Sequence, residues 1–328
     1  MAYDAAALGE LLADLTCLSE QADGWPVLAA HPGGAPANFL AAMAAGGAGT
    51  VMLGKVGDDA FGRKLTDSLR RAGIGTEGIV TDENVFTTLA FVTLDDRGER
   101  EFSFARSPGA DTCLRPEELD LGLLDGTRMF HFGSLSLTDE PVRSATRLAL
   151  ETARARGCLI SYDPNYRAPL WKSEAEARHA MLWGLAQADA VKLSAEEAEF
   201  LLGQAPERAA ETILRDFGAK LVFVTCGAAG CCFRNPRAAG HVPALPGVIP
   251  TDTTGAGDIF FGSAMHRLLR SGTAPEALTE AQLRGIAAYA CAAAGLSTER
   301  SGGISSVPTP AEVLEAMKRT GYETEIRI

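Results

Sequence analysis

The chain has 328 residues, of which 46% are apolar, enough to bury a large core in one α/β domain. Its formal net charge of −12 argues against nucleic acid or an anionic membrane as a partner, because both require a basic face. No apolar run reaches the length of a membrane span, and the N-terminus lacks the basic start of a signal peptide. The seven cysteines and five histidines form no zinc pattern. We therefore expect a cytoplasmic protein with reduced thiols.

Strand and helix patterns alternate over the first 75 residues. The elements predicted there are a buried strand at 6–15, a helix at about 36–45, a strand at 50–53, a loop at 54–59 and a helix at 61–72. The pair Gly33-Gly34 before the first helix lets a ligand approach the backbone, and Asn38 can both donate and accept hydrogen bonds toward a diol. Alternatively, the glycine pair is only a packing turn. Asp14 lies near the end of the predicted strand at 6–15, where it could be only a solvated carboxylate.

A β-hairpin is predicted next. Residues 87–94 and 100–106 alternate around the turn Asp95-Asp96-Arg97-Gly98. Phe104 and Arg106 occupy alternate positions of the second strand, so they share one face. Arg106 could reach into a pocket, or it could be a solvated arginine at the edge of the hairpin.

From residue 129 onward, strand and helix patterns alternate in a way that predicts a parallel sheet with crossover helices. The predicted strands are 129–132, 158–163, 188–193, 221–225 and a short strand from 231, and the predicted helices include 141–156, 281–295 and 310–319. Open α/β sheets bind ligands at the carboxyl ends of their strands. Asn165 and Arg167, after the strand at 158–163, are therefore candidates for binding a ligand. Alternatively, Asn165 only caps its turn. Glu197 follows the strand at 188–193 at the start of a helix, where an acid can simply complement the helix dipole.

The segment Asp252-Thr253-Thr254-Gly255-Ala256-Gly257-Asp258 precedes apolar residues at helical spacing, so it predicts a glycine turn entering a helix. The free backbone N–H groups and the positive end of the helix dipole would make an anion site there. Asp258, in the first turn, is badly placed to bind a phosphate but well placed to take a proton from a hydroxyl that attacks one. The chain has no GxxxxGK[ST] sequence, so a P-loop is excluded.

The sequence DTTGAGD at 252–258 resembles the signature of the ribokinase family of sugar and nucleoside kinases, also called the phosphofructokinase-B family. The segments GGAPAN at 33–38 and GKVGDDAFG at 54–62 resemble a second motif of the same family. The resemblance extends over nearly the whole chain. It implies a single domain, residues 1–328, with a ribokinase-like α/β fold: a three-layer sandwich with a mostly parallel central sheet. It also implies a small β-strand lid from strands inserted at about 12–30 and 86–107, and a homodimer formed through the lids.

The resemblance further implies ATP-dependent phosphorylation of a sugar hydroxyl. Asp258 would be the general base, and the amides of Gly255, Ala256 and Gly257 would stabilise the transferring phosphoryl group. The implied sugar contacts are Asp14, Gly33, Gly34, Asn38, Phe104, Arg106, Asn165, Arg167 and Asp258. The implied ATP contacts are Lys192, Ser194, Thr225, Gly227, Gly230, Gly255, Gly257 and Cys291.

Two cations are also implied by the resemblance. Glu197 would act on Mg²⁺ through water, next to Ser194, where the wider family usually has Asn. A monovalent cation such as K⁺ would lie near Asp252, Thr254, Ser297, Gly302 and Ser306, although the loop from 297 to 306 could be only structural.

The resemblance makes D-fructose the expected substrate. The segments 98–102, 106–111, 163–167 and 192–197 look most like those of fructokinases, which make fructose 6-phosphate. The alternative is a 2-keto-3-deoxygluconate kinase, whose acidic substrate would need Arg106 and Arg167, or another ribokinase-family sugar kinase. A hypothesis from a different class is a non-catalytic sugar-binding protein on the same fold.

Overall fold

The computed structural model describes residues 2–94 and 100–322. Its strands are β1 (Ala5–Leu8), β2 (Leu12–Glu20), β3 (Pro26–Gly33), β4 (Thr50–Gly57), β5 (Ile74–Asp82), β6 (Leu89–Leu94), β7 (Arg100–Ala105), β8 (Met129–Gly133), β9 (Leu159–Asp163), β10 (Ala190–Ser194), β11 (Leu221–Thr225), β12 (Cys231–Arg234) and β13 (Ala239–Val242). Its α-helices are α1 (Ala35–Ala45), α2 (Ala60–Arg71), α3 (Val142–Ala155), α4 (Glu174–Leu185), α5 (Ala195–Leu202), α6 (Pro206–Asp216), α7 (Ala256–Ser271), α8 (Glu280–Ser297) and α9 (Pro310–Arg319). Among these described helices, none combines the length and the apolar character needed to cross a membrane.

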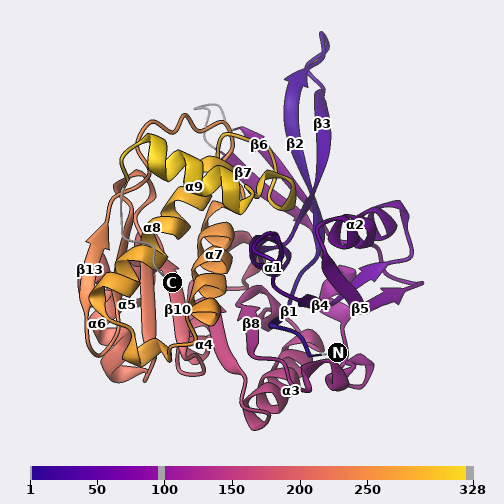
Figure 1. Cartoon of the computed structure of the whole chain (residues 1–328). Helices are drawn as coiled ribbons and strands as arrows, with labels where there is room; N and C mark the ends of the chain where they lie inside the picture. The colour runs from indigo at the N-terminus through magenta and orange to yellow at the C-terminus, as the bar shows by residue number, and fades with distance from the viewer. Residues whose placement is uncertain (1, 95–99, 323–328) are drawn as a thin grey trace.

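The central sheet has nine strands in the order β13-β12-β11-β10-β9-β8-β1-β4-β5. The strands from β5 to β11 in this order are parallel, and β12 and β13 add antiparallel pairs at one edge. Helices α1, α7, α8 and α9 pack on one face, and α3, α4, α5 and α6 pack on the other (Figure 1). This is the three-layer α/β sandwich with a mostly parallel sheet that the sequence predicts.

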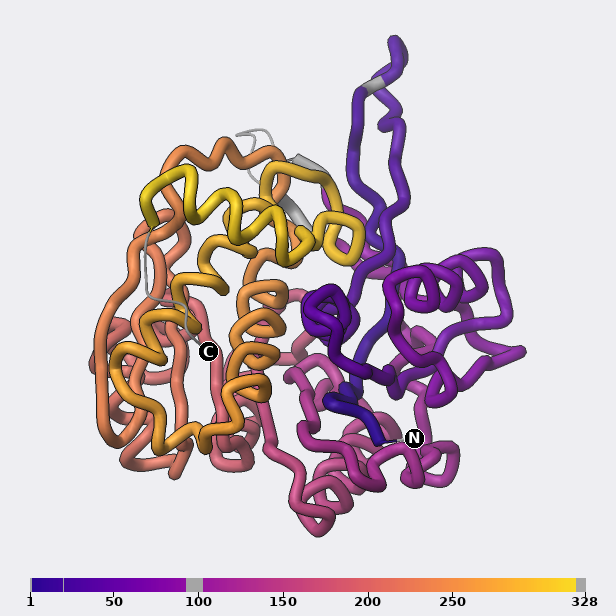
Figure 2. Tube along the Cα trace, in the orientation of Figure 1, coloured from indigo at the N-terminus to yellow at the C-terminus, as the bar shows by residue number. Residues whose placement is uncertain are grey.

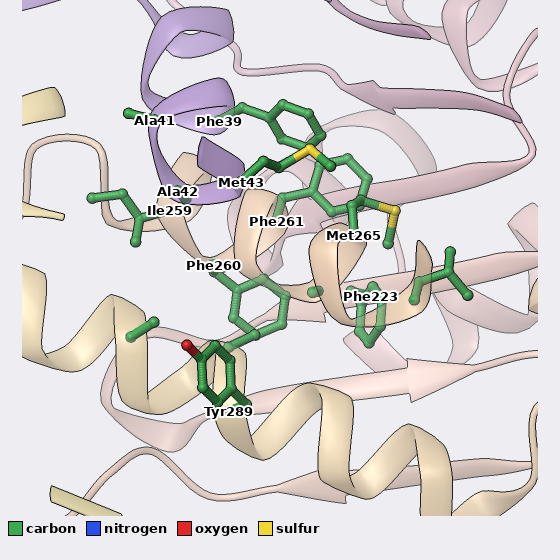
Figure 3. Packing of buried hydrophobic residues seen from close by; sticks show 14 of the residues in the cluster. Phe39, Ala41, Ala42, Met43, Phe223, Ile259, Phe260, Phe261, Met265 and Tyr289 are labelled. Atoms are coloured by element: carbon green, nitrogen blue, oxygen red, sulfur yellow. The ribbon is translucent and has the colours of Figure 1, made fainter. Parts of the chain in front are cut away.

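The core on the α7 face is built from large apolar side chains. Phe260 and Phe261 of α7 are buried, and Phe261 meets Phe39 of α1 edge to face at 5.5 Å between ring centroids. Phe260 makes a similar contact with Phe223 of β11 (Figure 3). These aromatic contacts hold α7 against both α1 and the sheet, and they thereby position the first turn of α7.

A second sheet forms the lid. Its four strands lie in the order β3-β2-β6-β7, and they fall in the two segments predicted for a lid. The hairpin of β2 and β3 projects away from the rest of the molecule (Figures 1 and 2). The strands β6 and β7 pair antiparallel as predicted, while the predicted turn at residues 95–98 lies outside the described residues.

The predicted single strand at 6–15 is wrong. The apolar run divides into β1, in the central sheet, and β2, in the lid. The chain leaves the central sheet at Gly9, where an added Cβ would lie 2.7 Å from the ring of Pro36. Asp14 therefore belongs to a lid strand rather than to the end of a core strand.

The predicted end of the next strand is also wrong. Instead of ending at residue 53, β4 continues to Gly57, because it pairs in parallel with β5 along its whole second half. Most of the predicted loop at 54–59 is therefore strand. The helix that follows, α2, agrees with the prediction to one residue at each end and is capped by Asp59.

Candidate active site

A cavity with a volume of about 740 Å³ lies beneath the lid. A second cavity of about 460 Å³ adjoins it. Residues from the loop after β9, from the turn before α7 and from the first turn of α7 line both cavities: Asn165, Tyr166, Arg167, Thr253, Gly255 and Asp258. Asp258 is therefore at the junction, where a group bound in one cavity can react with a group bound in the other.

The turn that begins α7 has a conformation that its sequence explains. Gly255, the N-cap residue, has φ of 75°, in the left-handed region that glycine tolerates best. The carboxylate of Asp252 fixes the turn, because it accepts hydrogen bonds from the backbone N–H groups of Thr254 and Gly302, both at 2.9 Å. Ala256 and Gly257, in the first turn of this 16-residue helix, line the smaller cavity, where an anion could meet their backbone N–H groups. The Ala256 N–H also donates to the Thr253 carbonyl at 3.3 Å.

Asp258 is buried and held by two side-chain amides. Asn38 of α1 donates to one carboxylate oxygen at 2.9 Å, and Asn165 donates to the other at 3.3 Å. Burial raises the pKa of Asp258 to about 6, against the opposing effects of the Lys192 charge and the Asn38 hydrogen bond. A carboxylate with this pKa is ionised at neutral pH and can still accept a proton readily.

Asn165 has an unusual backbone. Its φ of 48° is the only positive value found for a non-glycine residue in the described part of the chain. Asp163 stabilises this conformation by accepting a hydrogen bond from the Asn165 N–H at 3.1 Å. Such strain persists where the surroundings enforce it, and here it directs the Asn165 amide toward Asp258.

A buried cation lies beneath the first turn of α7. The Lys192 ammonium pairs with Asp163 at 2.8 Å. Burial alone would lower the pKa of Lys192, but the carboxylates of Asp163 and Glu197 outweigh it and raise the pKa, so Lys192 is charged. An added Cβ at Gly257 would lie 2.9 Å from the ammonium nitrogen, so a side chain there would displace the buried Lys192 head group. The positive charge of Lys192 would add to the helix dipole in attracting an anion.

Two carboxyl groups line the larger cavity near the lid. Burial raises the pKa of Asp14 to about 6, opposed by the charge of Arg167, and it raises the pKa of Glu10 to about 7. Glu10 accepts a hydrogen bond from the N–H of Ala35 at 2.8 Å. We did not predict Glu10 from the sequence, although a charged residue inside the apolar run at 6–15 was a usable signal.

Arg106 lies apart from the other predicted sugar contacts. Its guanidinium forms a buried ion pair with Asp111 at 2.7 Å and donates to Thr138 and to the carbonyl of Leu135. It borders a separate hollow of about 560 Å³, and Phe104 lines both this hollow and the larger cavity. In this conformation Arg106 braces the lid instead of entering the larger cavity.

The residues predicted to bind ATP divide into two groups. Lys192, Ser194, Gly255 and Gly257 line the smaller cavity, whereas Thr225, Gly227, Gly230 and Cys291 lie outside both cavities. Gly227 and Gly230 have φ of 53° and 99° in the turn between β11 and β12. Cys291 is buried in α8, and burial raises the pKa of its thiol to about 12, so it is not a reactive thiol.

Ser194 and Glu197 form a capping box at the start of α5. The Ser194 hydroxyl accepts from the Glu197 N–H at 3.1 Å, and Glu197 accepts from the Ser194 N–H at 2.7 Å. The other oxygen of Glu197 accepts from the Tyr166 N–H at 2.8 Å. Both residues therefore have a structural role, and both also line the smaller cavity.

The candidate residues for a monovalent cation gather at the loop after α8. Asp252 accepts from Gly302 as described, and Ser306 donates to the carbonyl of Gly303 at 2.8 Å. Ser297 donates to Ala294 within its own helix. No group of three or more His, Cys, Asp or Glu side chains suited to a metal ion occurs in residues 2–94 and 100–322. A cation here would have to rely mainly on backbone oxygens.

Comparison with known proteins shows the family of the chain. The model of the pfkB family carbohydrate kinases matches residues 4–310. The chain is 42% identical over 296 residues to fructokinase-1 of Zea mays, covering 90% of each chain, and 41% identical over 289 residues to a fructokinase of Solanum tuberosum, covering 88% of this chain and 86% of that protein.

Solved structures give the same result. The fructokinase of Xylella fastidiosa with bound ATP has 31% identity and a TM-score of 0.89, covering 97% of this chain and 99% of that one. A fructokinase of Vibrio cholerae O395 with fructose, ADP and calcium ion has 29% identity and a TM-score of 0.83, covering 95% and 98%. These likenesses confirm the ribokinase-like fold. The chain therefore belongs to the pfkB family of carbohydrate kinases and is a sugar kinase, a phosphotransferase that acts on an alcohol group.

Proposed function

We propose that the protein is an ATP-dependent fructokinase that converts D-fructose to fructose 6-phosphate, with Asp258 as its general base. The observation that carries this proposal is the position of Asp258, buried at the junction of the two cavities, in the first turn of α7 and between two amide donors. The proposal is also supported by the relatives, since a fructokinase similar in structure binds fructose and ADP.

The reaction follows from this arrangement. The sugar occupies the larger cavity, and the γ-phosphate of ATP enters the smaller one. The hydroxyl oxygen of the sugar bonds to the γ-phosphorus as its proton passes to Asp258, and the bond from that phosphorus to the β–γ bridging oxygen breaks to release ADP. The N–H groups of Gly255, Ala256 and Gly257, together with Lys192, stabilise the charge on the transferring group.

The lining of the larger cavity favours a neutral sugar over an acidic one. Three carboxyl groups border it, from Glu10, Asp14 and Asp258, and Arg167 is the cation among its described lining residues. Arg106, a candidate for binding a substrate carboxylate, is paired with Asp111 instead. An acidic substrate such as 2-keto-3-deoxygluconate would face repulsion here, whereas sugar hydroxyls can donate to these carboxylates.

The residues present fit the cations that such a reaction uses. Mg²⁺, when bound with ATP, would reduce the negative charge of the phosphates. Glu197 would hold it through water, because its carboxylate borders the smaller cavity and keeps lone pairs beyond its two N–H bonds. A K⁺ ion would lie by Asp252 and the carbonyl groups of the loop around Gly302.

Two further features belong to this proposal. The protein forms a homodimer through its lid strands, because the hairpin of β2 and β3 exposes apolar side chains. It acts in the cytoplasm, where its seven cysteines, all free in the structure, would stay reduced.

The test is ADP release with Mg-ATP, with and without K⁺, on D-fructose and on 2-keto-3-deoxygluconate in parallel. We expect turnover on fructose, little on the keto acid, and a loss of at least ~10² in kcat for Asp258→Asn with ATP binding retained. Turnover on the keto acid alone would reassign the substrate. Near-normal kcat in Asp258→Asn would refute the general base, and sugar binding without ADP formation would favour a non-catalytic protein.

A further inference from the structure

Helix α1 begins without a capping side chain of its own. Its N-cap residue is Gly34, whose Cα lies so close to the carbonyl of Glu10 that an added Cβ would clash with it. The first N–H of the helix, from Ala35, instead donates to the Glu10 carboxylate at 2.8 Å. A residue 25 positions earlier, at the strand end that leads into the lid, thus replaces the missing cap.

The same helix turn carries a contact of the proposed base. Asn38, three residues after Ala35, is buried and donates its amide to Asp258 at 2.9 Å. Its amide oxygen has no hydrogen-bond partner among the described residues, so the position of Asn38 depends on the helix backbone, on this one bond and on the packing of its amide against Gly255 and Gly303. The backbone of α1 is in turn pressed against α7, where Gly262 leaves no room for a side chain beside Phe39.

Glu10 interacts electrostatically with three charged residues. Arg106, just after β7, and Asp111 act on Glu10, and Asp258 of α7 is affected by the charge of Glu10. Burial is the main cause that raises the pKa of Glu10 to about 7, while the N–H groups and Arg106 oppose it. The negative charge of Glu10 raises the pKa of Asp258 further.

We propose that Glu10 is a positioning residue for phosphoryl transfer: its carboxyl group fixes the first turn of α1 and thereby holds the Asn38 amide against Asp258. The proposal rests on the proposed function, in which Asp258 is the base. The proposal gives a role to Glu10, the buried acid in the connection between β1 and β2. Loss of the contact would displace a group beside the reacting atoms, and small displacements of this kind can cost up to about 10²-fold in rate.

The test compares Glu10→Gln, which keeps an acceptor for Ala35 and removes the charge, with Glu10→Ala, which removes both. The control is Ser173→Ala, which deletes an N-cap of the same kind from α4, outside both cavities. Three quantities are measured: hydrogen exchange of the amides in residues 35–41, the kcat and KM on the sugar that wild type turns over, and the pH dependence of kcat.

In Glu10→Ala we expect faster exchange in residues 35–41 and a kcat lower by about 10- to 100-fold, with the KM for ATP unchanged. In Glu10→Gln we expect exchange close to wild type and little change in the acid limb of kcat, because Glu10, with a pKa of about 7, is already mostly protonated at the pH near 6 where Asp258 titrates. Ser173→Ala should change neither the exchange in residues 35–41 nor kcat. Wild-type exchange in Glu10→Ala, or exchange in Glu10→Gln as fast as in Glu10→Ala, would overturn the proposal. The exchange readout needs no turnover, so it is independent of whether Asp258→Asn removes activity.

Discussion

The side chain of Asp258 is both buried and in contact with space that a ligand can enter. It is buried, with 9% of its surface exposed, yet it borders two cavities. Burial makes the ionised form costly, and the amides of Asn38 and Asn165 with the charge of Lys192 reduce that cost. The balance leaves a base whose pKa of about 6 is closer to neutral pH than that of an exposed aspartate.

This pKa predicts a pH dependence. Asp258 must be ionised to accept a proton, so kcat should be level above pH 7 and fall as the pH drops through about 6. The measurement is the kcat for the sugar between pH 5 and pH 8.5, with circular dichroism to show that the fold persists. Asp14 titrates in the same range, so Asp14→Asn is the matched control: it should raise the KM for the sugar and leave the acid limb of kcat in place. A kcat that stays level down to pH 5 would contradict Asp258 as the base.

At this scale the sequence predicts residue types better than partners. The motif at 252–258 predicts the glycine turn and the placement of Asp258 in the first helical turn, as the structure has them, while the anion site stays a prediction. It does not predict that Arg106 pairs with Asp111, because both side chains could reach several groups and the tertiary packing decides between them. Glu10 was missed for the same reason, since its partner Ala35 lies in another element.

At the scale of elements, periodic patterns locate most helices and core strands. The predicted strand at 129–132 and the helices at 36–45, 61–72 and 310–319 agree with the structure to within about two residues at each end. The prediction of one strand at 6–15 is wrong because both sheets bury apolar residues. The sequence therefore shows no break in hydrophobicity where the chain passes from one sheet to the other. That point is set by the contact of Gly9 with Pro36.

The connection between β7 and the central sheet yields a stability prediction. Arg106 and Asp111 are almost completely buried, and Asp111 also accepts a hydrogen bond from Thr88. Removing one partner leaves the other charge buried and unpaired, so Arg106→Met should lower the free energy of unfolding by about 3–5 kcal/mol. The measurement is equilibrium unfolding in urea.

The matched control for this pair is Arg70→Met, which breaks the exposed ion pair with Asp67 at 2.8 Å. It should cost only about 0–1 kcal/mol. If Arg106→Met is as stable as Arg70→Met, the buried pair does not brace the lid, and Arg106 is free to serve the substrate instead.

At the scale of the whole molecule, the lid is less well supported than the sandwich. The strand β2 pairs with β6 only over Ala13–Thr16, so beyond Thr16 its hairpin with β3 is a two-stranded ribbon that projects from the molecule (Figure 2). Such a ribbon is marginally stable alone in water. Its outer part also exposes Leu18 by 67%, Trp25 by 70% and Val27 by 40%. An apolar, unsupported ribbon of this kind indicates a surface that another protein surface covers.

We expect that surface to be the lid of a second copy, so the protein should have a mass near twice 34.4 kDa in light scattering after gel filtration. Replacing both Leu18 and Trp25 with Asp should give a monomer, because two charges would have to be buried in the interface. The control is Leu314→Asp on α9, which changes an exposed apolar residue outside the lid and should leave the dimer intact. Since Asp14 lies on the same strand, the monomer should also bind the sugar more weakly, with a raised KM and a nearly unchanged KM for ATP. A wild-type monomer, or a double variant that remains dimeric, would show that the ribbon serves another purpose.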